Sequence, residues 1–308
     1  MEGDTKKRMS RRRFLRLGCG ALLGGMAGCG LSPLYAIRVE PRWIEVVRLE
    51  LTLRGLPAAF DGLTIAQISD LHCGPHIPPS YIRHAVTLAN GLKADLVLLT
   101  GDFVTRSAHY SAACAQALAD LQASYGVYAV LGNHDNWTDP DIVAANLERV
   151  GITVLRDARH PLEVSGTRLW LLGVEDTGYT GWRGSPFHRF RERWQPAADR
   201  LAALLTDIPQ EEPRLLLVHN PDFTEMLPPG RVDLALCGHT HGGQVRLPLI
   251  GAPIVPSCFG QKYRSGLVQG PRTLVYINRG IGLVSPPIRL NCRPEITLFR
   301  LRRRAAQG

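Results

Sequence analysis

Short apolar runs recur along this 308-residue chain, and each ends abruptly at a polar cluster. The runs are rich in Leu, Val and Ile and are too short for helices, which is typical of β-strands buried on both faces. They occupy residues 63–69, 95–100, 127–131, 215–218 and 232–237. Because tight-turn residues follow these runs, we expect all of them to be central strands of a sheet.

The segments between these strands have the apolar spacing of helices. One of them begins with Asp139 and Pro140, a pair typical of a helix N-terminus. The predicted helices cover residues 79–92, 111–121, 138–147 and 197–205. Alternation of strands and helices predicts an α/β fold with parallel strands at its centre. Further strands, expected at residues 169–172, 267–268, 274–277 and 296–299, extend this to two sheets packed face to face with helices outside.

Side chains that can bind metals follow all of the central strands. Carboxylate, imidazole and amide groups are ligands that divalent Mn, Fe and Zn accept. The motifs are Asp70-Leu71-His72, Gly101-Asp102, Gly132-Asn133-His134-Asp135, His219 and Gly238-His239-Thr240-His241. Each motif alone is more often a turn or a surface pair than a metal site. Ligands of α/β sheets bind beyond the carboxyl ends of strands, however, so the whole set predicts one metal site.

This ordered set of motifs resembles that of the calcineurin-like metallophosphoesterases, over roughly residues 60–300. The resemblance implies a four-layer α-β-β-α sandwich of two mixed sheets that binds two divalent metal ions. It implies that the first metal has four protein ligands, Asp70, His72, Asp102 and His241. The second metal would share Asp102 and add three more ligands, Asn133, His219 and His239. His134 would act beside the metals as a general acid or a transition-state stabiliser, oriented by Asp135.

The chemistry of such a site predicts a hydrolase of phosphodiester or pyrophosphate bonds. Two cations that share Asp102 would lower the pKa of a bridging water and give a hydroxide that attacks phosphorus. His134 would then protonate the leaving oxygen, a task that suits imidazole near neutral pH. Manganese is the first choice of metal, with iron, zinc, cobalt and nickel as alternatives. A nuclease, a broad phosphatase and a metal-binding surface protein without turnover stay open as other functions.

The amino terminus carries a second signal. Ser10-Arg11-Arg12-Arg13-Phe14-Leu15-Arg16 resembles a twin-arginine export motif, and an apolar run follows at residues 17–28. A dozen helical residues reach about 18 Å, short of the ~30 Å hydrocarbon core of a bilayer. We therefore expect an export signal rather than a membrane span. Met26-Ala27-Gly28-Cys29 is similar to a lipoprotein processing site, so lipidation, cleavage elsewhere and retention as an anchor are the alternatives.

These signals divide the chain and predict where it acts. We expect an export signal or anchor at residues 1–29, a tether at 30–45 and the metallophosphoesterase domain at 46–304. The expected partners are the twin-arginine export machinery and a membrane surface on the periplasmic or extracytoplasmic side. The formal net charge is +9, but the basic clusters lie at the two ends of the chain. This distribution does not favour a nucleic-acid partner and suits an anionic membrane.

The substrate is indicated less directly. Residues 177–194 form an insertion rich in Gly, aromatic residues and Arg, which would either overhang the metals and grip phosphate or form a plain surface loop. Residues 242–248 and 278–282 are expected to run close to the site. These stretches resemble the exported, membrane-associated branch of the family, some of whose members cleave UDP-diacylglucosamine in lipid A synthesis. A lipid-linked pyrophosphate of that kind is the leading specific expectation.

Overall fold

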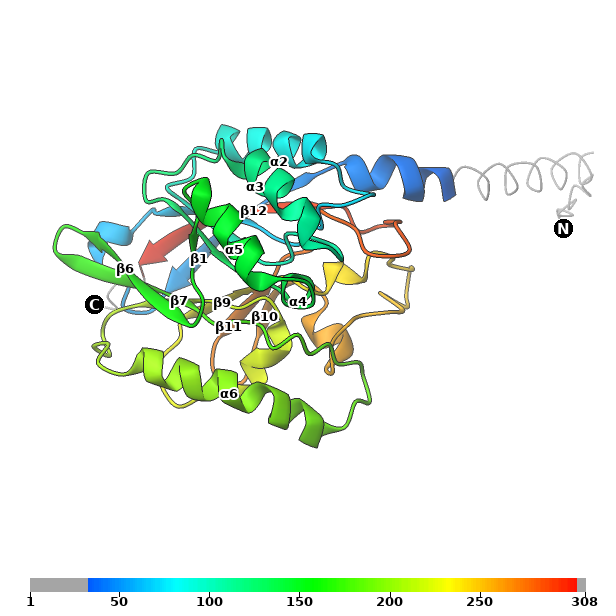
Figure 1. Cartoon of the computed structure of the whole chain (residues 1–308). Coiled ribbons are helices and arrows are strands. Elements are labelled where there is room, and N and C mark those ends of the chain that lie inside the picture. Colours follow the sequence, from blue (N-terminus) through cyan, green and yellow to red (C-terminus); the bar gives the residue numbers. More distant parts are fainter. Residues whose placement is uncertain (1–32, 304–308) are drawn as a thin grey trace, which may run out of the picture.

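The computed structural model describes residues 33–303, which form two six-stranded mixed sheets packed face to face (Figure 1). The first sheet contains, in spatial order, β1 (Glu45–Leu53), β12 (Glu295–Arg303), β2 (Thr64–Ile68), β3 (Leu96–Thr100), β4 (Val127–Val130) and β5 (Thr153–Val154). The second contains β10 (Gly266–Gln269), β11 (Leu274–Ile277), β9 (Leu234–Cys237), β8 (Arg214–Leu217), β7 (Thr167–Gly173) and β6 (Ala158–Val164). The predicted fold class is confirmed, including every predicted strand.

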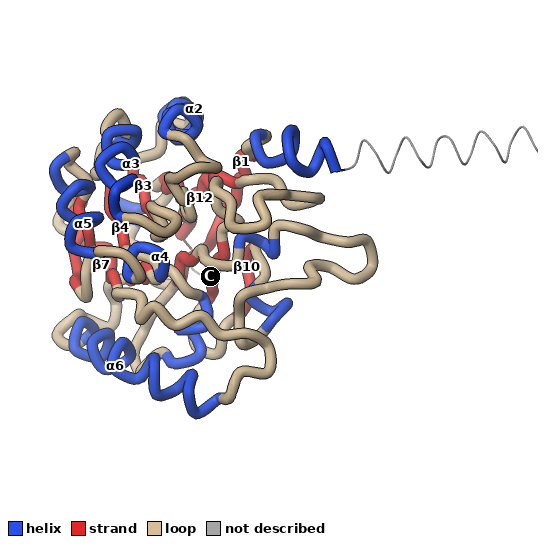
Figure 2. The backbone as a smooth tube through the Cα atoms, turned by 45° about the vertical axis from the view of Figure 1, so that its right-hand side comes forward, coloured by secondary structure: helices blue, strands red, loops and turns tan. Residues whose placement is uncertain are grey.

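Helices cover both outer faces of this pair of sheets, which completes the four layers (Figures 1 and 2). The helices are α2 (Pro79–Gly91), α3 (Ser111–Leu118), α4 (Asn133–Asn136), α5 (Pro140–Arg149) and α6 (Phe187–Leu205). The first sheet is covered by α2, α3 and α5, and the second by α6. Shorter helical turns lie at Tyr35–Val39, Glu40–Arg42, Ala58–Phe60, Ala108–Tyr110, Pro221–Met226, His241–Gly243 and Gly260–Tyr263.

Three apolar layers hold the two sheets and the helices together. Strand β3 lies between two of these layers, which explains why its sequence is an unbroken apolar run. Leu98 packs between the two sheets, whereas Leu99 packs under the helices of the first sheet. Successive strand residues point to opposite faces, and both faces of β3 are buried. In the third layer, Trp194 of α6 packs with Leu216 of β8. Burial on both faces therefore replaces the alternation of polar and apolar residues that exposed strands show.

The helix predicted at residues 197–205 is longer than predicted, because α6 already begins at Phe187. Phe190, Trp194, Ala197 and Leu201 repeat at helical spacing and are fully buried. Pro196 lies inside the helix, and proline normally ends a helix pattern in a sequence. The second half of the predicted insertion is therefore a packed helix. The helix predicted from Asp139 is confirmed, because the Asp139 side chain accepts a hydrogen bond from the Ile142 N–H at 3.0 Å.

The export segment predicted at residues 1–29 lies outside the described residues. The described part of the predicted tether packs against the domain. Glu40 is buried there, and its carboxylate accepts hydrogen bonds from the backbone N–H groups of Asn291, at 3.0 Å, and of Cys292. Among residues 33–303, no helix combines the length and apolar character that crossing a membrane requires.

Candidate metal centre

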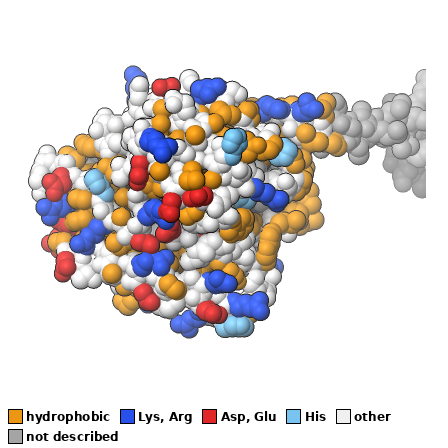
Figure 3. All heavy atoms as spheres, viewed as in Figure 1, with side chains coloured by type: hydrophobic (Ala, Val, Ile, Leu, Met, Phe, Trp, Pro, Cys, Tyr) orange, Lys and Arg blue, Asp and Glu red, His pale blue; other side chains and the backbone are white. Residues whose placement is uncertain are grey.

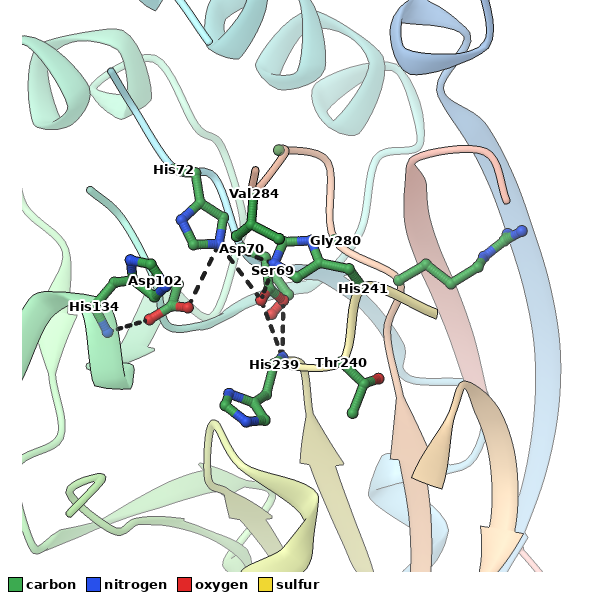
Figure 4. A network of polar contacts seen from close by, with 12 residues as sticks. Ser69, Asp70, His72, Asp102, His134, His239, Thr240, His241, Gly280 and Val284 are labelled. Atoms are coloured by element: carbon green, nitrogen blue, oxygen red, sulfur yellow. Dashed lines mark hydrogen bonds and ion pairs between the residues drawn. The ribbon is translucent and has the colours of Figure 1, made fainter. Parts of the chain in front are cut away.

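The strand ends of the two sheets bring the predicted ligands together. Strands β2, β3 and β4 run parallel in one sheet, and β8 and β9 run parallel in the other, so their carboxyl ends face one edge of the sandwich. The His239 backbone N–H, beyond β9, donates to the carboxylate of Asp70, beyond β2, at 3.0 and 3.1 Å. This contact joins the two sheets at the site, and Figure 4 shows the surrounding side chains converging there.

One group of ligand atoms lies around Asp70. His72 Nε2 is 2.9 Å from His241 Nε2, and His241 Nε2 is 3.3 Å from Asp70 Oδ1. His72 Nε2 also lies 3.5 Å from Asp102 Oδ2. All of these side chains are buried. Three of the residues predicted to hold the first metal, Asp70, His72 and His241, therefore present their ligand atoms to one small space, and Asp102 adjoins it through His72.

A second group shares Asp102. His219 Nε2 lies 3.1 Å from Asp102 Oδ2, and His239 Nδ1 lies 2.7 Å from Asn133 Oδ1. The rings of His219 and His239 pack edge to face, with centroids 5.2 Å apart. The Asp102 carboxylate thus faces ligand atoms of both groups, which is the arrangement expected of a bridging ligand.

The chemistry of His219 fits a bound cation. Its Nδ1 lies 2.7 Å from the Thr100 carbonyl oxygen, which accepts, so Nε2 is the ring nitrogen directed at the carboxylates. Burial alone would lower the pKa of His219, but Asp102 and Asp70 outweigh burial and raise that pKa well above its usual value. The site therefore stabilises positive charge at this position, and divalent cations would supply that charge.

The remaining pKa values match a set of metal ligands. Burial lowers the pKa of His72 and of His239 to about 3, so both imidazoles are neutral near pH 7 and able to coordinate. Burial raises the pKa of Asp70 to about 6, against the opposing charge of His219. Burial also acts to raise the pKa of Asp102, but His219 and His134 hold it well below its usual range. Asp102 is therefore the carboxylate most strongly kept ionised.

The backbone at the site is strained. Left-handed φ angles between 50° and 72° occur at Asp70, His72, Asp102, His239 and His241. Side-chain-bearing residues rarely adopt this conformation, which costs of order 1–3 kcal/mol each and persists where the surrounding structure enforces it. Such strain is typical of functional sites. The loops after β2, β3 and β9 are therefore shaped to aim these side chains, at the expense of local stability.

His134 stands at the mouth of the site. Its ring lies 4.7 Å from that of His72 and 4.6 Å from that of Trp137, measured between centroids. Its backbone N–H donates to Asp102 Oδ1 at 2.8 Å, and its Nδ1 makes a short contact with the Thr105 carbonyl oxygen. Unlike the predicted ligands, His134 is only partly buried. It is therefore placed to meet a substrate bound over Asp102.

The predicted role of Asp135 as the group that orients His134 is wrong. The Asp135 carboxylate accepts hydrogen bonds from the backbone N–H groups of Gly132, at 2.9 Å, Phe103, at 2.9 Å, and Val104, at 3.1 Å. It thus fixes the loops after β3 and β4, while a backbone carbonyl contacts the imidazole. A carbonyl carries no sequence signal, which is why the prediction chose the neighbouring carboxylate.

A cavity of about 540 Å³ opens over the ligands. Its walls carry His134, Arg106 and Trp137, of which only His134 was predicted, and Thr180 and Trp182 from the insertion. The arginines of the insertion do not belong to this lining. The insertion therefore overhangs the site, as one of the two alternatives expected, but with an aromatic ring instead of a cation. Arg106 lies in the loop after β3, and nothing in its sequence context distinguished it from other surface arginines.

The two segments expected to run close to the site do so. The backbone N–H of Gly282 donates to the Asp70 carbonyl oxygen at 2.7 Å. Gly280 lies so close to Asp70 that a side chain at this position would overlap it. Gly243, Gln244 and Val245 line the cavity. Both predictions are confirmed.

Buried carboxylates and imidazoles at the ends of parallel strands define the site of a metal-dependent hydrolase. Residues 63–243 match the model of the calcineurin-like phosphoesterase family. The chain belongs to this family, and it is a phosphoester hydrolase by that membership and by its relatives.

Relatives match along nearly the whole chain. It is 33% identical over 300 residues to the uncharacterized metallophosphoesterase YkuE of Bacillus subtilis, covering 96% of this chain and 99% of YkuE. It is 34% identical over 298 residues to the phosphodiesterase YaeI of Escherichia coli, covering 95% and 99% of the two chains. It is 27% identical over 309 residues to the UDP-2,3-diacylglucosamine pyrophosphatase LpxG of Chlamydia trachomatis, covering 88% and 93%.

Proposed function

We propose that this protein is a dinuclear metal-dependent hydrolase of phosphodiester or pyrophosphate bonds, with manganese as its leading metal. The observation that carries the proposal is the position of Asp102, whose Oδ2 faces His72 Nε2 at 3.5 Å and His219 Nε2 at 3.1 Å. One metal would be held by Asp70, His72, Asp102 and His241. The other would be held by Asp102, Asn133, His219 and His239. This assignment uses all seven predicted ligands and leaves none without a role.

The bound cations would activate a water and neutralise the phosphoryl oxygens. The protein contributes orientation and a proton. His134 is held between the rings of His72 and Trp137, and its Nδ1 faces the Thr105 carbonyl oxygen, so its other nitrogen is free for the leaving oxygen. Arg106 lines the same cavity and supplies a guanidinium for a phosphate oxygen.

The substrate that fits best is a lipid-linked pyrophosphate such as UDP-2,3-diacylglucosamine. LpxG of Chlamydia trachomatis carries that substrate in its name and aligns with most of this chain. The cavity adds Pro253, Ile254 and Pro256 to the polar groups around the metals, and such a wall suits an acyl chain. We also propose export by the twin-arginine route and action at an extracytoplasmic membrane surface, for which the sequence motif Ser10-Arg11-Arg12-Arg13-Phe14-Leu15-Arg16 is the support.

The experiment that tests this proposal starts with the full-length protein stripped of metal by a chelator. We expect hydrolysis of bis(p-nitrophenyl) phosphate to return when Mn²⁺ is added, with two metal ions bound per chain. The lipid-linked substrate is then tested with UDP-2,3-diacylglucosamine, whose hydrolysis is measured by the UMP that it releases. Two bound metals without hydrolysis of either compound would contradict the proposal and favour a metal-binding protein without turnover.

A further inference from the structure

An unusually apolar loop stands beside the mouth of the cavity. Leu249, Ile250 and Ile254 are strongly exposed, with relative accessible areas of 108%, 68% and 63%, although isoleucine and leucine are normally buried. Leu249 also has a left-handed φ of 64°. Scattered apolar residues are common on surfaces, but a cluster of this kind marks an interaction site.

A second group of exposed apolar residues lies where the described chain begins. Leu34, Ile37 and Val39, on the first helical turns, are all exposed. In Figure 1 these turns and the loop after residue 246 lie on the same side of the molecule, and the view in Figure 2 agrees. Figure 3 shows hydrophobic side chains gathered along this right-hand edge, below the amino-terminal turns.

The segment 283–288 connects the two groups. Leu283 and Pro287 line a cavity of about 400 Å³ together with Ile37. Val284 and Pro286 line the cavity over the metals together with Ile254. The first helical turns, segment 283–288 and loop 247–254 therefore form one continuous surface, called here the apolar face, and it includes the mouth of the catalytic cavity.

The exposed charged side chains that line the two cavities of this face are arginines. Arg38 and Arg42 line the smaller cavity, and Arg106 lines the larger. The acidic side chain in these two linings is Asp102, which belongs to the metal centre. Apolar side chains bordered by arginines are the pattern of proteins that bind the surface of an anionic bilayer.

We propose that the apolar face inserts into the surface of an anionic lipid bilayer, so that a lipid-borne phosphoester reaches the metals without leaving the membrane. This inference rests on the proposed function and adds the surface that delivers the substrate. A bilayer suits the face better than a second copy of the chain, because a second copy seated there would close the cavity mouth. The apolar run at residues 17–28 also precedes this face directly in the sequence.

The test uses full-length protein and vesicles of phosphatidylcholine with phosphatidylglycerol. The double variant Leu249→Asp, Ile250→Asp should lower the vesicle partition coefficient in flotation by roughly tenfold or more, because two large aliphatic side chains no longer leave water. Ile142→Asp, at an exposed isoleucine on α5, is the matched control and should float like wild type. Leu249→Phe, Ile250→Phe should keep full binding.

Two substrates separate this inference from the proposed function. The Asp double variant should hydrolyse soluble bis(p-nitrophenyl) phosphate at the wild-type rate and lose at least tenfold on a diacyl phospholipid with a p-nitrophenyl phosphodiester head group in vesicles. If wild type does not hydrolyse soluble bis(p-nitrophenyl) phosphate, the proposed function is contradicted. Flotation would still test whether the apolar face binds the bilayer. Equal flotation of the Asp double variant and wild type would overturn the inference. The inference would also be overturned if wild type self-associates and the Asp double variant abolishes this self-association without changing flotation.

Discussion

The Asp102 carboxylate accepts a hydrogen bond from the His134 backbone N–H at 2.8 Å through Oδ1, while Oδ2 faces His219 Nε2 at 3.1 Å. One side chain therefore positions the start of α4, which carries His134, and also faces the ligand atoms of both groups. In the proposed mechanism, this contact couples the ligand that the two metals would share to His134, the group proposed to protonate the leaving oxygen.

We first predict that Asp102→Asn reduces kcat/KM on bis(p-nitrophenyl) phosphate by at least ~100-fold, because both metals lose a shared negative ligand. Metal content per chain, measured by mass spectrometry, should fall with it. Asp95→Asn is the matched control, since Asp95 lies just before the opposite end of β3 and binds Thr64. That variant should keep its metals and its activity. Near-full turnover by Asp102→Asn would exclude a bridging role.

We next predict that His134→Ala keeps both metals and loses about 100- to 10,000-fold in kcat, the range for a general acid. The loss should shrink for a diester with a more acidic leaving group, because such a group departs without a proton. His160→Ala, a half-buried histidine hydrogen-bonded to Tyr128, is the control and should stay active. A loss independent of the leaving group would show that His134 stabilises the transition state without donating a proton.

A third prediction concerns Gly238. A methyl group there would overlap the Ser69 hydroxyl and the Asp70 carboxylate. Gly238→Ala should therefore displace Asp70 and reduce kcat/KM by about 100-fold, as misplacement by 1 Å does, with about 1–3 kcal/mol lost from the free energy of unfolding. Gly91→Ala, at the end of α2 with open space around it, should leave kcat/KM unchanged and raise the free energy of unfolding by at most about 1 kcal/mol. Activity assays and chemical denaturation on the two variants measure both effects.

The sequence predicted the central strands well because burial on both faces leaves an unbroken apolar run, as at β3. It predicted β12 only at residues 296–299, because Arg300, Arg302 and Arg303 extend the strand beyond its apolar part. Those residues pair with β1 from the other end of the chain. Such pairing depends on contacts about 250 residues apart, which local patterns do not contain.

The residues of the site also divide into those that the sequence predicted and those that only the structure shows. Side chains predicted to carry the chemistry, such as Asp102 and His219, follow buried strands and were visible in the sequence. The groups that orient them, such as the Thr105 carbonyl against His134 and the Asp135 carboxylate on Phe103, are set by how loops meet. Backbone groups look alike in every sequence, so the orientation of His134 could only come from the structure.

The last prediction is a pH dependence of stability from Asp222, which lies outside the metal centre. Asp222 is buried, and its carboxylate accepts hydrogen bonds from the Ser257 hydroxyl and, at 2.7 Å, from the Cys258 N–H. Burial raises its pKa to about 6, from 3.8, despite these bonds. The folded state therefore binds the proton more tightly than the unfolded state, so this contribution to stability is present below pH 4 and is lost as the pH rises through about 6.

Asp222→Asn removes that titration, and its amide can donate to the Ser257 hydroxyl while its oxygen accepts from the Cys258 N–H. The variant should therefore become more stable relative to wild type as the pH rises. The difference between their free energies of unfolding should grow by up to about 3 kcal/mol between pH 4 and pH 7. In thermal unfolding this is a gain of several degrees at pH 7 that vanishes at pH 4. Asp199→Asn, on the exposed side of α6, controls for the loss of a charge. A difference between Asp222→Asn and wild type that stays constant with pH would show that the buried carboxylate is ionised at no cost.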